Sequence, residues 1–204
     1  MTIQRAYLFK RFERFWHWSQ AALVFTLLAS GLRIHGVYGG LHFLTALRLH
    51  LYAAWAVSAL WVFAIFWHFT TGEWKQYIPT LEKIGAVARH YAWGMFLGER
   101  HPHHPTPAHK QNALQRLAYL WLKLMINPLL WGSGILLLLA TYNWLPAARW
   151  AAPGQGIALA AWAHTAGAYL MLVFVIVHVY LATTGVTPLA HIEAMITGWE
   201  ASEE

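Results

Sequence analysis

The stretch IALAAWAHTAGAYLMLVFVIVHVYLATT occupies residues 157–184, has no acidic residue, lysine or arginine, and contains two histidines, His164 and His178. It is longer than the roughly 20 apolar residues that an α-helix needs to cross a membrane. Fourteen residues advance a helix by about 21 Å through nearly four full turns, so both imidazoles leave the same face. Ionisable residues inside a span indicate function. The stretch therefore predicts a membrane helix with two ligands at two depths.

Composition extends this prediction to the whole chain. Of the 204 residues 58% are hydrophobic and only 11% are charged, against about 25% charged in an ordinary soluble domain. Three more apolar stretches have the length of a span, at residues 15–32, 49–69 and 117–142. The first contains His17 and no small-residue cleavage site, which favours a retained helix over a signal peptide. We expect a single all-α membrane domain over residues 1–204, built as a four-transmembrane-helix bundle.

Basic residues predict the orientation of this bundle. Four precede the first span and six lie in the loop 70–116, whereas the two opposite loops contain only Arg33, Arg48 and Arg149. By the positive-inside rule both termini and the long loop are cytoplasmic, as in a multi-pass protein of the bacterial cytoplasmic (inner) membrane. This placement also explains the net charge of +6 without a nucleic-acid partner. Apolar residues at helical spacing predict a surface helix at residues 188–199.

The histidines fall into two level pairs once the helices are oriented. The chain has no cysteine, which excludes iron–sulfur clusters and thioether-linked haem within it, so any haem is b-type and held by histidine. His50 lies level with His164, and His17 lies level with His178. A haem iron takes two axial imidazoles from opposite sides, and antiparallel helices can supply them. The bundle is therefore expected to hold two b-type haems.

Two alternatives concern other histidines. His50 and His68 are eighteen residues apart, about 27 Å along a helix, and also share a face. This spacing does not match the 21 Å between the histidines of the last span, and His68 falls at the water interface, so His17 is the favoured ligand. The Pro/His-rich segment 101–109 offers metal-binding groups, but an exposed irregular loop is the favoured interpretation.

Several motifs resemble one family. Over nearly its whole length the chain resembles the di-haem cytochrome b membrane subunits of formate dehydrogenase (gamma subunit), nickel–iron hydrogenase and thiosulfate reductase. The resemblance rests on RFWHW at 14–18, RLH at 48–50, NALQR at 112–116 and the His164/His178 pair. The segment WHFTTGEWKQYIP at 67–79 is similar to the thiosulfate reductase branch.

The resemblance implies the same two ligand pairs and a quinone site. One haem is expected on His50 and His164, and the other on His17 and His178. A menaquinone or ubiquinone site is implied beside the cytoplasmic haem, with these candidate residues: Asn112, Gln115, His109 and His68. Leu114 stands where some relatives place glycine or proline. Capping of the third membrane helix is the alternative role for the two amides.

These expectations combine into one functional hypothesis. The chain is expected to be an electron-transfer subunit that connects membrane quinone with an outer-face (periplasmic) redox subunit, which bears molybdenum, nickel–iron or several haems. No catalytic residue beyond the quinone site is expected in it. The alternatives are a stand-alone membrane oxidoreductase acting on a small molecule at the outer haem, and a non-redox transporter that uses its histidines for protons or metal.

Overall fold

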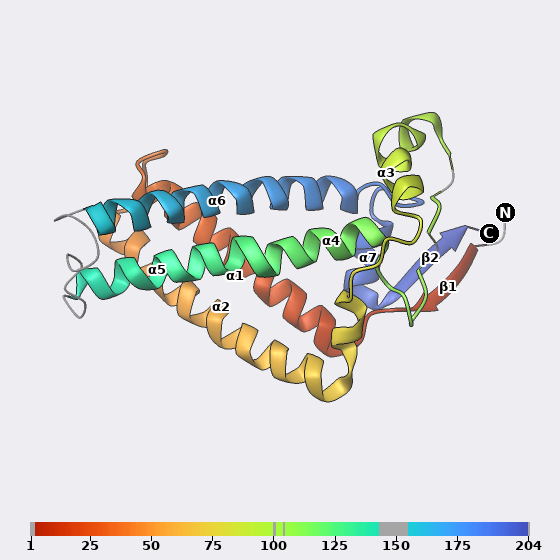
Figure 1. Cartoon of the computed structure of the whole chain (residues 1–204), viewed down its shortest axis with the longest axis horizontal. Helices are drawn as coiled ribbons and strands as arrows, with labels where there is room; N and C mark the ends of the chain where they lie inside the picture. Colours follow the sequence, from red (N-terminus) through yellow and green to blue (C-terminus); the bar gives the residue numbers. More distant parts are fainter. Residues whose placement is uncertain (1–2, 100, 104, 143–154, 204) are drawn as a thin grey trace.

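A computed structural model describes residues 3–99, 101–103, 105–142 and 155–203. Within these residues, four long rods run along the long axis of the molecule (Figure 1). The first two are α1 (Arg11–Ile34) and α2 (Phe43–Thr71). The third is α4 (Ala113–Trp121), a π-helical turn η3 (Leu122–Ile126) and α5 (Asn127–Thr141). The fourth is α6 (Gln155–Ala182). Arg149, used above for the orientation, lies outside the described residues.

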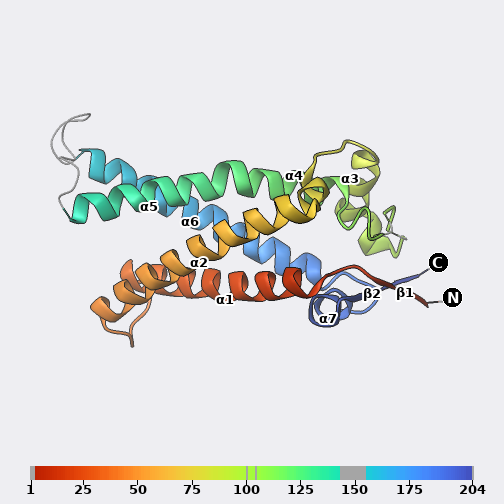
Figure 2. The same cartoon turned by 90° about the horizontal axis from the view of Figure 1, so that it is seen from below.

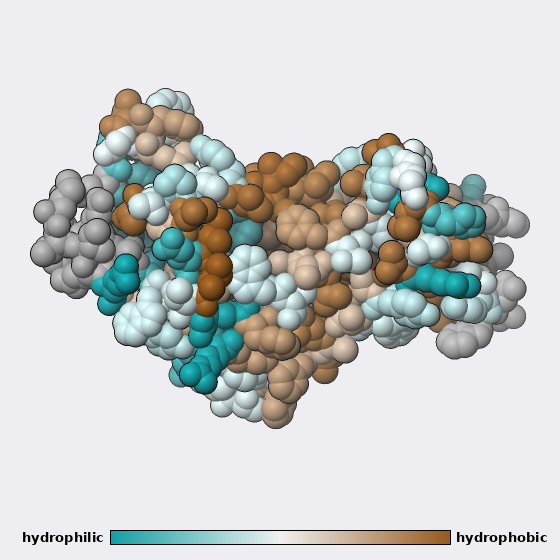
Figure 3. All heavy atoms as spheres, turned by 180° about the vertical axis from the view of Figure 1, so that it is seen from behind, coloured by the Kyte–Doolittle hydropathy of each residue, from teal (hydrophilic) through white to brown (hydrophobic). Residues whose placement is uncertain are grey.

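Three of these rods can cross a membrane by length and composition: α2, the α4–α5 rod and α6. Their large apolar side chains point outward, as Trp162 shows with 74% of its surface exposed. An apolar exterior of this extent is typical of lipid contact. Figure 3 shows apolar residues over the middle of the molecule and polar ones towards the ends. The more polar α1 covers the predicted span 15–32 but is not among the three, since polar residues such as His17, Ser19 and Gln20 lower the mean hydropathy of that stretch.

The rods are arranged as two helical hairpins. α1 packs against α2, and α5 packs against α6, as both views show (Figures 1 and 2). Phe12 and Trp67 hold the first hairpin, with ring centres 4.6 Å apart. Trp61 of α2 meets Trp131 of α5 edge to face at 5.1 Å and connects the two hairpins. The inner faces of the hairpins therefore lie opposite each other.

The π-helical turn in the third rod has a local cause. Pro128 stands in the first turn of α5, where its ring has no N–H to donate and would clash with the carbonyl four residues earlier in a regular helix. The wider turn at Leu122–Ile126 accommodates it. Lys123 lies in this turn, with its Nζ 3.0 Å from the centre of the Tyr77 ring. Wide turns of this kind occur frequently at functional sites.

The short elements cap the end that holds both termini (Figure 1). The helical ones are η1 (Glu73–Tyr77), α3 (Ile84–Ala92), η2 (Gly94–Leu97) and α7 (Ala190–Thr197). In addition β1 (Ile3–Tyr7) pairs antiparallel with β2 (Trp199–Glu203). No sequence pattern predicted this ribbon. The helix expected at 188–199 also ends earlier than expected, and Trp199 belongs to β2.

Gly198 explains why α7 stops where it does. It has a φ of +92°, in the left-handed region that glycine adopts without steric cost. Its carbonyl accepts hydrogen bonds from the backbone N–H groups of Leu8 and Phe9, at 2.9 and 3.2 Å. A Cβ at this position would lie 2.6 Å from Cε2 of Tyr7 and 2.7 Å from the Phe9 carbonyl oxygen. The turn that starts the ribbon therefore requires glycine.

A half-buried ion cluster fastens α1, η1 and the segment before α4. The buried Lys110 contacts Glu13 at 2.7 Å and Glu73 at 3.2 Å, and Lys10 contacts Glu73 at 2.6 Å. Burial alone would raise the pKa of Glu73, but the hydrogen bonds from both lysines hold it below its usual value. Three segments far apart in the sequence are thus tied together at the start of α1, seven residues or fewer from His17.

Candidate functional site

Two pairs of histidines face each other across the space between the helices. The rings of His50 on α2 and His164 on α6 have their centres 6.0 Å apart. The rings of His17 on α1 and His178 on α6 have their centres 6.1 Å apart. A single helix, α6, therefore supplies one member of each pair. These are the pairs that depth along the helices predicts.

The ring separation fits a metal ion between the two imidazoles of each pair. Two metal–nitrogen bonds of about 2 Å, plus the distance from each nitrogen to its ring centre, place the centres roughly 6 Å apart. A direct hydrogen bond between the rings, with nitrogens about 2.9 Å apart, would bring the centres to roughly 5 Å. Both observed separations match the first case. No three His, Asp or Glu side chains group as a metal site in the described part of the chain.

His50 and His164, called the outer pair after the membrane face that the charge pattern predicts for them, contact two serines that sequence analysis missed. Ser30 Oγ lies 3.0 Å from Nδ1 of His50, and Ser133 Oγ lies 3.0 Å from Nδ1 of His164. Both serines are buried. In each ring Nε2 is left available to face the partner histidine. The signal for these residues was present, because a Ser-Gly pair occurs inside each of two spans, at 30–31 and 133–134.

The glycines of these Ser-Gly pairs make room for the rings. A Cβ on Gly134 would lie 3.2 Å from Cε1 of His164, and one on Gly31 would lie 3.5 Å from Cε1 of His50. Gly167 instead lies against Leu130, where a Cβ would come within 3.0 Å. A Cβ on Gly132 would have no atom within 4 Å. Two glycines therefore serve the ligands and one serves helix packing.

The inner pair, His17 and His178, has a different environment. Nδ1 of His17 is buried without a hydrogen-bond partner among the described residues. Phe174, one turn before His178, stacks on its ring at 5.9 Å with the planes only 6° apart. Trp18 meets the His17 ring edge to face at 5.2 Å. Aromatic rings thus orient the inner pair, whereas hydrogen bonds orient the outer pair.

Among the residues that the structure describes, His68 does not face another histidine in this way. Its Nδ1 lies 2.6 Å from the Ala64 carbonyl oxygen, and its Nε2 lies 3.3 Å from the Tyr77 hydroxyl. Trp16 packs edge to face on the ring at 5.1 Å. Both nitrogens are therefore engaged within the protein, and the structure brings His17 rather than His68 to His178. Burial raises the pKa of Tyr77 well above its usual value, so this hydroxyl remains protonated.

Three of the four candidate quinone residues, His109, Asn112 and Gln115, lie at the start of α4, but the two amides are used by the helix. The Asn112 side chain accepts from the backbone N–H of Gln115 at 2.9 Å, and the Gln115 side chain accepts from that of Asn112 at 3.0 Å. This reciprocal pair is a capping box. Asn112 Nδ2 also donates to the Tyr91 hydroxyl at 3.2 Å, and His109 Nδ1 accepts from Arg116 at 3.1 Å. The helix-capping role considered above is thus realised.

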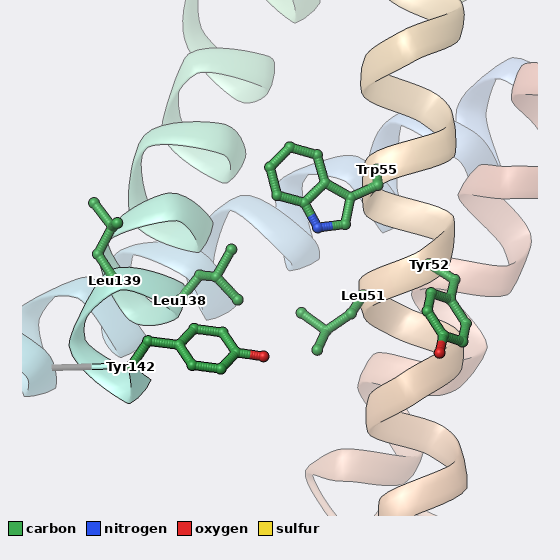
Figure 4. Close-up of a pocket in the computed structure, with 6 residues that line it drawn as sticks. All are labelled: Leu51, Tyr52, Trp55, Leu138, Leu139 and Tyr142. Atoms are coloured by element: carbon green, nitrogen blue, oxygen red, sulfur yellow. The ribbon is translucent and has the colours of Figure 1, made fainter. Parts of the chain in front are cut away.

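An apolar hollow lies between α2 and α5 near the level of the outer pair. Its volume is about 240 Å³, and Figure 4 shows the six residues that line it: Leu51, Tyr52, Trp55, Leu138, Leu139 and Tyr142. Leu51 directly follows His50 in the chain. The two hairpins therefore leave an apolar hollow between α2 and α5, which neither His50 nor His164 lines.

Two facing histidine pairs inside a bundle of apolar helices define a class of protein, the membrane cytochromes that bind b-type haem. The chain belongs to the prokaryotic cytochrome b561 family, whose model matches residues 8–198. It is also similar to "Putative cytochrome YdhU" of Escherichia coli (strain K12), with 30% identity over 206 residues that cover 96% of this chain and 75% of that protein. No solved structure matches the chain.

Membership of this family confirms the resemblance to b-type cytochromes. The protein is a multi-pass membrane cytochrome, and its function is electron transport by b-type haem. The histidine pairs provide what such a cofactor needs: two nitrogens on opposite sides, apolar surroundings and a ring separation that matches an iron between them.

Proposed function

We propose that the protein holds two haems, one on His50 and His164 and the other on His17 and His178, and conducts electrons between membrane quinone and a redox partner. The observation that carries this proposal is the equal separation of the two histidine pairs, 6.0 and 6.1 Å, along one helix. When bound, the haems supply the one-electron chemistry. The chain itself supplies ligands, burial and orientation. A transporter that uses histidines for protons does not require such matched pairs.

The two histidine pairs are assigned to opposite membrane faces by the distribution of charge. The end with both termini contains the ion cluster of Lys10, Lys110, Glu13 and Glu73 and most basic residues, so we assign it to the cytoplasm. In this arrangement α1 is the fourth span, although it is more polar than the others. His17 and His178 then lie near the cytoplasmic face, and His50 and His164 lie near the outer face, where a partner with molybdenum, nickel–iron or several haems would exchange electrons.

Haem content gives the direct test of this proposal. The purified protein should contain two haems per chain, extractable by acid and organic solvent because no cysteine can attach them covalently. A pyridine haemochrome assay against protein concentration measures the ratio. A ratio of one or none would contradict the proposal, as would haem that stays with the denatured protein.

The quinone site is proposed near the inner pair, at the start of α4. Asn112, Gln115, His109 and Arg116 meet there, close to the aqueous face where protons enter. The His68–Tyr77 contact with Lys123 nearby forms a second polar group at a similar depth. Quinone carbonyls need hydrogen-bond donors, which amide, imidazole and phenol groups all provide. His109 and His68 are the proposed proton relays.

Replacing Asn112 and Gln115 together by leucine should slow quinol-linked haem reduction about fivefold or more, since each lost hydrogen bond is worth about 1 kcal/mol. Haem spectra should stay normal because neither residue is a ligand. Stopped-flow absorbance with a soluble quinol measures the rate.

Asn112→Ser provides the matched control for this double variant. Serine keeps the helix cap but removes the amide. A slow rate in Asn112→Ser supports contact between the amide and quinone, whereas a normal rate assigns Asn112 to the helix cap alone. Normal rates in the double variant would place the quinone elsewhere, with the surroundings of His68 as the next site.

A further inference from the structure

The contacts around the outer pair repeat on the two hairpins. Ser30 lies on α1 and touches His50 on α2, and Ser133 lies on α5 and touches His164 on α6, both at 3.0 Å. The backbone carbonyl three residues before each serine is hydrogen-bonded to the same imidazole. Leu27 is bonded to His50, and Leu130 is bonded to His164. A glycine follows each serine and lies against the same imidazole. Each hairpin thus presents a serine, a carbonyl and a glycine to its ligand.

The hydrogen-bond partners decide where the proton of each imidazole lies. A serine hydroxyl has one hydrogen to donate. Ser30 donates to the Thr26 carbonyl at 2.6 Å, and Ser133 donates to the Leu129 carbonyl at 2.5 Å. The serine oxygens can therefore only accept from the histidines. The Leu130 carbonyl, 3.1 Å from Nδ1 of His164, can also only accept. Nδ1 of each outer histidine must carry the hydrogen, which leaves the lone pair on Nε2.

We propose that Ser30 and Ser133 are positioning residues that lower the reduction potential of the outer haem relative to the inner one. This inference rests on the proposed function. A histidine that donates from its second nitrogen is a more basic ligand, and a more basic ligand stabilises ferric iron against ferrous iron. Both ligands of the outer pair have this support.

Among the described residues, the inner pair has no hydrogen bonds equivalent to those of the outer pair. Nδ1 of His17 has no hydrogen-bond partner among the described residues, and within the same residues the contacts of His178 are with aromatic rings. Hydrogen bonds around a ligand and burial are the means by which a protein sets haem potentials. The two haems therefore differ in reduction potential. Electrons that enter at the outer haem pass to the inner haem, whose reduction potential is higher.

The test is a redox titration of the purified protein, followed by haem absorbance, with Ser30→Ala, Ser133→Ala and the double variant. Alanine removes the serine acceptor without adding volume, and the backbone carbonyls of Leu27 and Leu130 remain. In the double variant the ratio of ferrous to ferric outer haem at a fixed potential should rise about tenfold, which corresponds to 59 mV for a one-electron couple. Single variants should shift less, and the inner haem should keep its potential. The spectral component that His164→Ala removes identifies the outer haem.

Controls separate this effect from a general disturbance of the helices. Ser58→Ala on α2 removes a hydroxyl that donates only along its own helix, to Ala54 at 2.8 Å, and should shift neither potential. Ser30→Thr keeps a hydroxyl and should restore the potential. Equal shifts of both haems, or no shift in the double variant, would overturn the inference while leaving the haem ligands intact. A wild-type protein with fewer than two haems would instead overturn the proposed function itself.

Discussion

His164→Ala is expected to leave the protein with one haem in place of two. The substitution removes one of the two proposed ligands of the outer haem and none of the inner haem, because His178, fourteen residues further along α6, faces His17 with ring centres 6.1 Å apart. An iron with one remaining protein ligand in an apolar site is held weakly, so the outer haem is lost on purification. Haem content per chain and the reduced visible spectrum measure the result. The inner haem should remain reducible by quinol.

His50→Ala provides the decisive comparison for this first prediction. If His50 and His164 hold the same haem, both variants must lose the same spectral component. His42→Ala is the matched control, because His42 precedes the first turn of α2 and does not belong to either pair. Loss of different components from His50→Ala and His164→Ala would show that the two histidines serve different haems, and the pairing would be wrong.

His17→Ala is expected to remove the other haem, while His68→Ala leaves both in place. His17 faces His178, whereas both nitrogens of His68 already have partners in the Ala64 carbonyl and the Tyr77 hydroxyl. His178→Ala should lose the same component as His17→Ala. Haem content and spectra of the three variants, purified in parallel, measure the result.

The opposite outcome would reassign the inner ligand. If His68→Ala lost a haem and His17→Ala kept both, the ligands of the inner site would be His68 and His178, and α2 would carry two ligands. A slower quinol reaction in His68→Ala with normal haem content would fit a role beside the quinone.

The facing histidines could be found from the sequence because their placement depends on regular helices. Residues fourteen apart on one helix share a face wherever the helix is packed, and positive charges orient the helices relative to each other. The structure brings together the same pairs, His17 with His178 and His50 with His164. Family membership then confirms the cytochrome class.

Features that depend on distant segments could not be found in this way. β1 and β2 stand at opposite ends of the sequence, and each has only five residues, too few for a clear alternation. The Ser-Gly pairs at 30–31 and 133–134 are visible in the sequence, but their contact with His50 and His164 is not, since only the packing of α1 on α2 and of α5 on α6 creates it. The capping box at Asn112 was recognised only as an alternative to quinone contact, because a cap and a ligand contact need the same amide.

The wide turn at Leu122–Ile126 changes the angular position of the residues that follow it in the third rod. A wide turn contains one residue more than an α-helical path would need, and one residue corresponds to about 100° of rotation. The side chains of α4 and α5 therefore follow two different helical registers. α4 packs against α3 and η1, and α5 packs against α6. Residues on either side of the turn do not share a face at ordinary helical spacing. A chimaera that replaced the turn with straight helix of the same length would bring Gly132 instead of Ser133 to His164, whereas a straight helix one residue shorter would keep Ser133 in place.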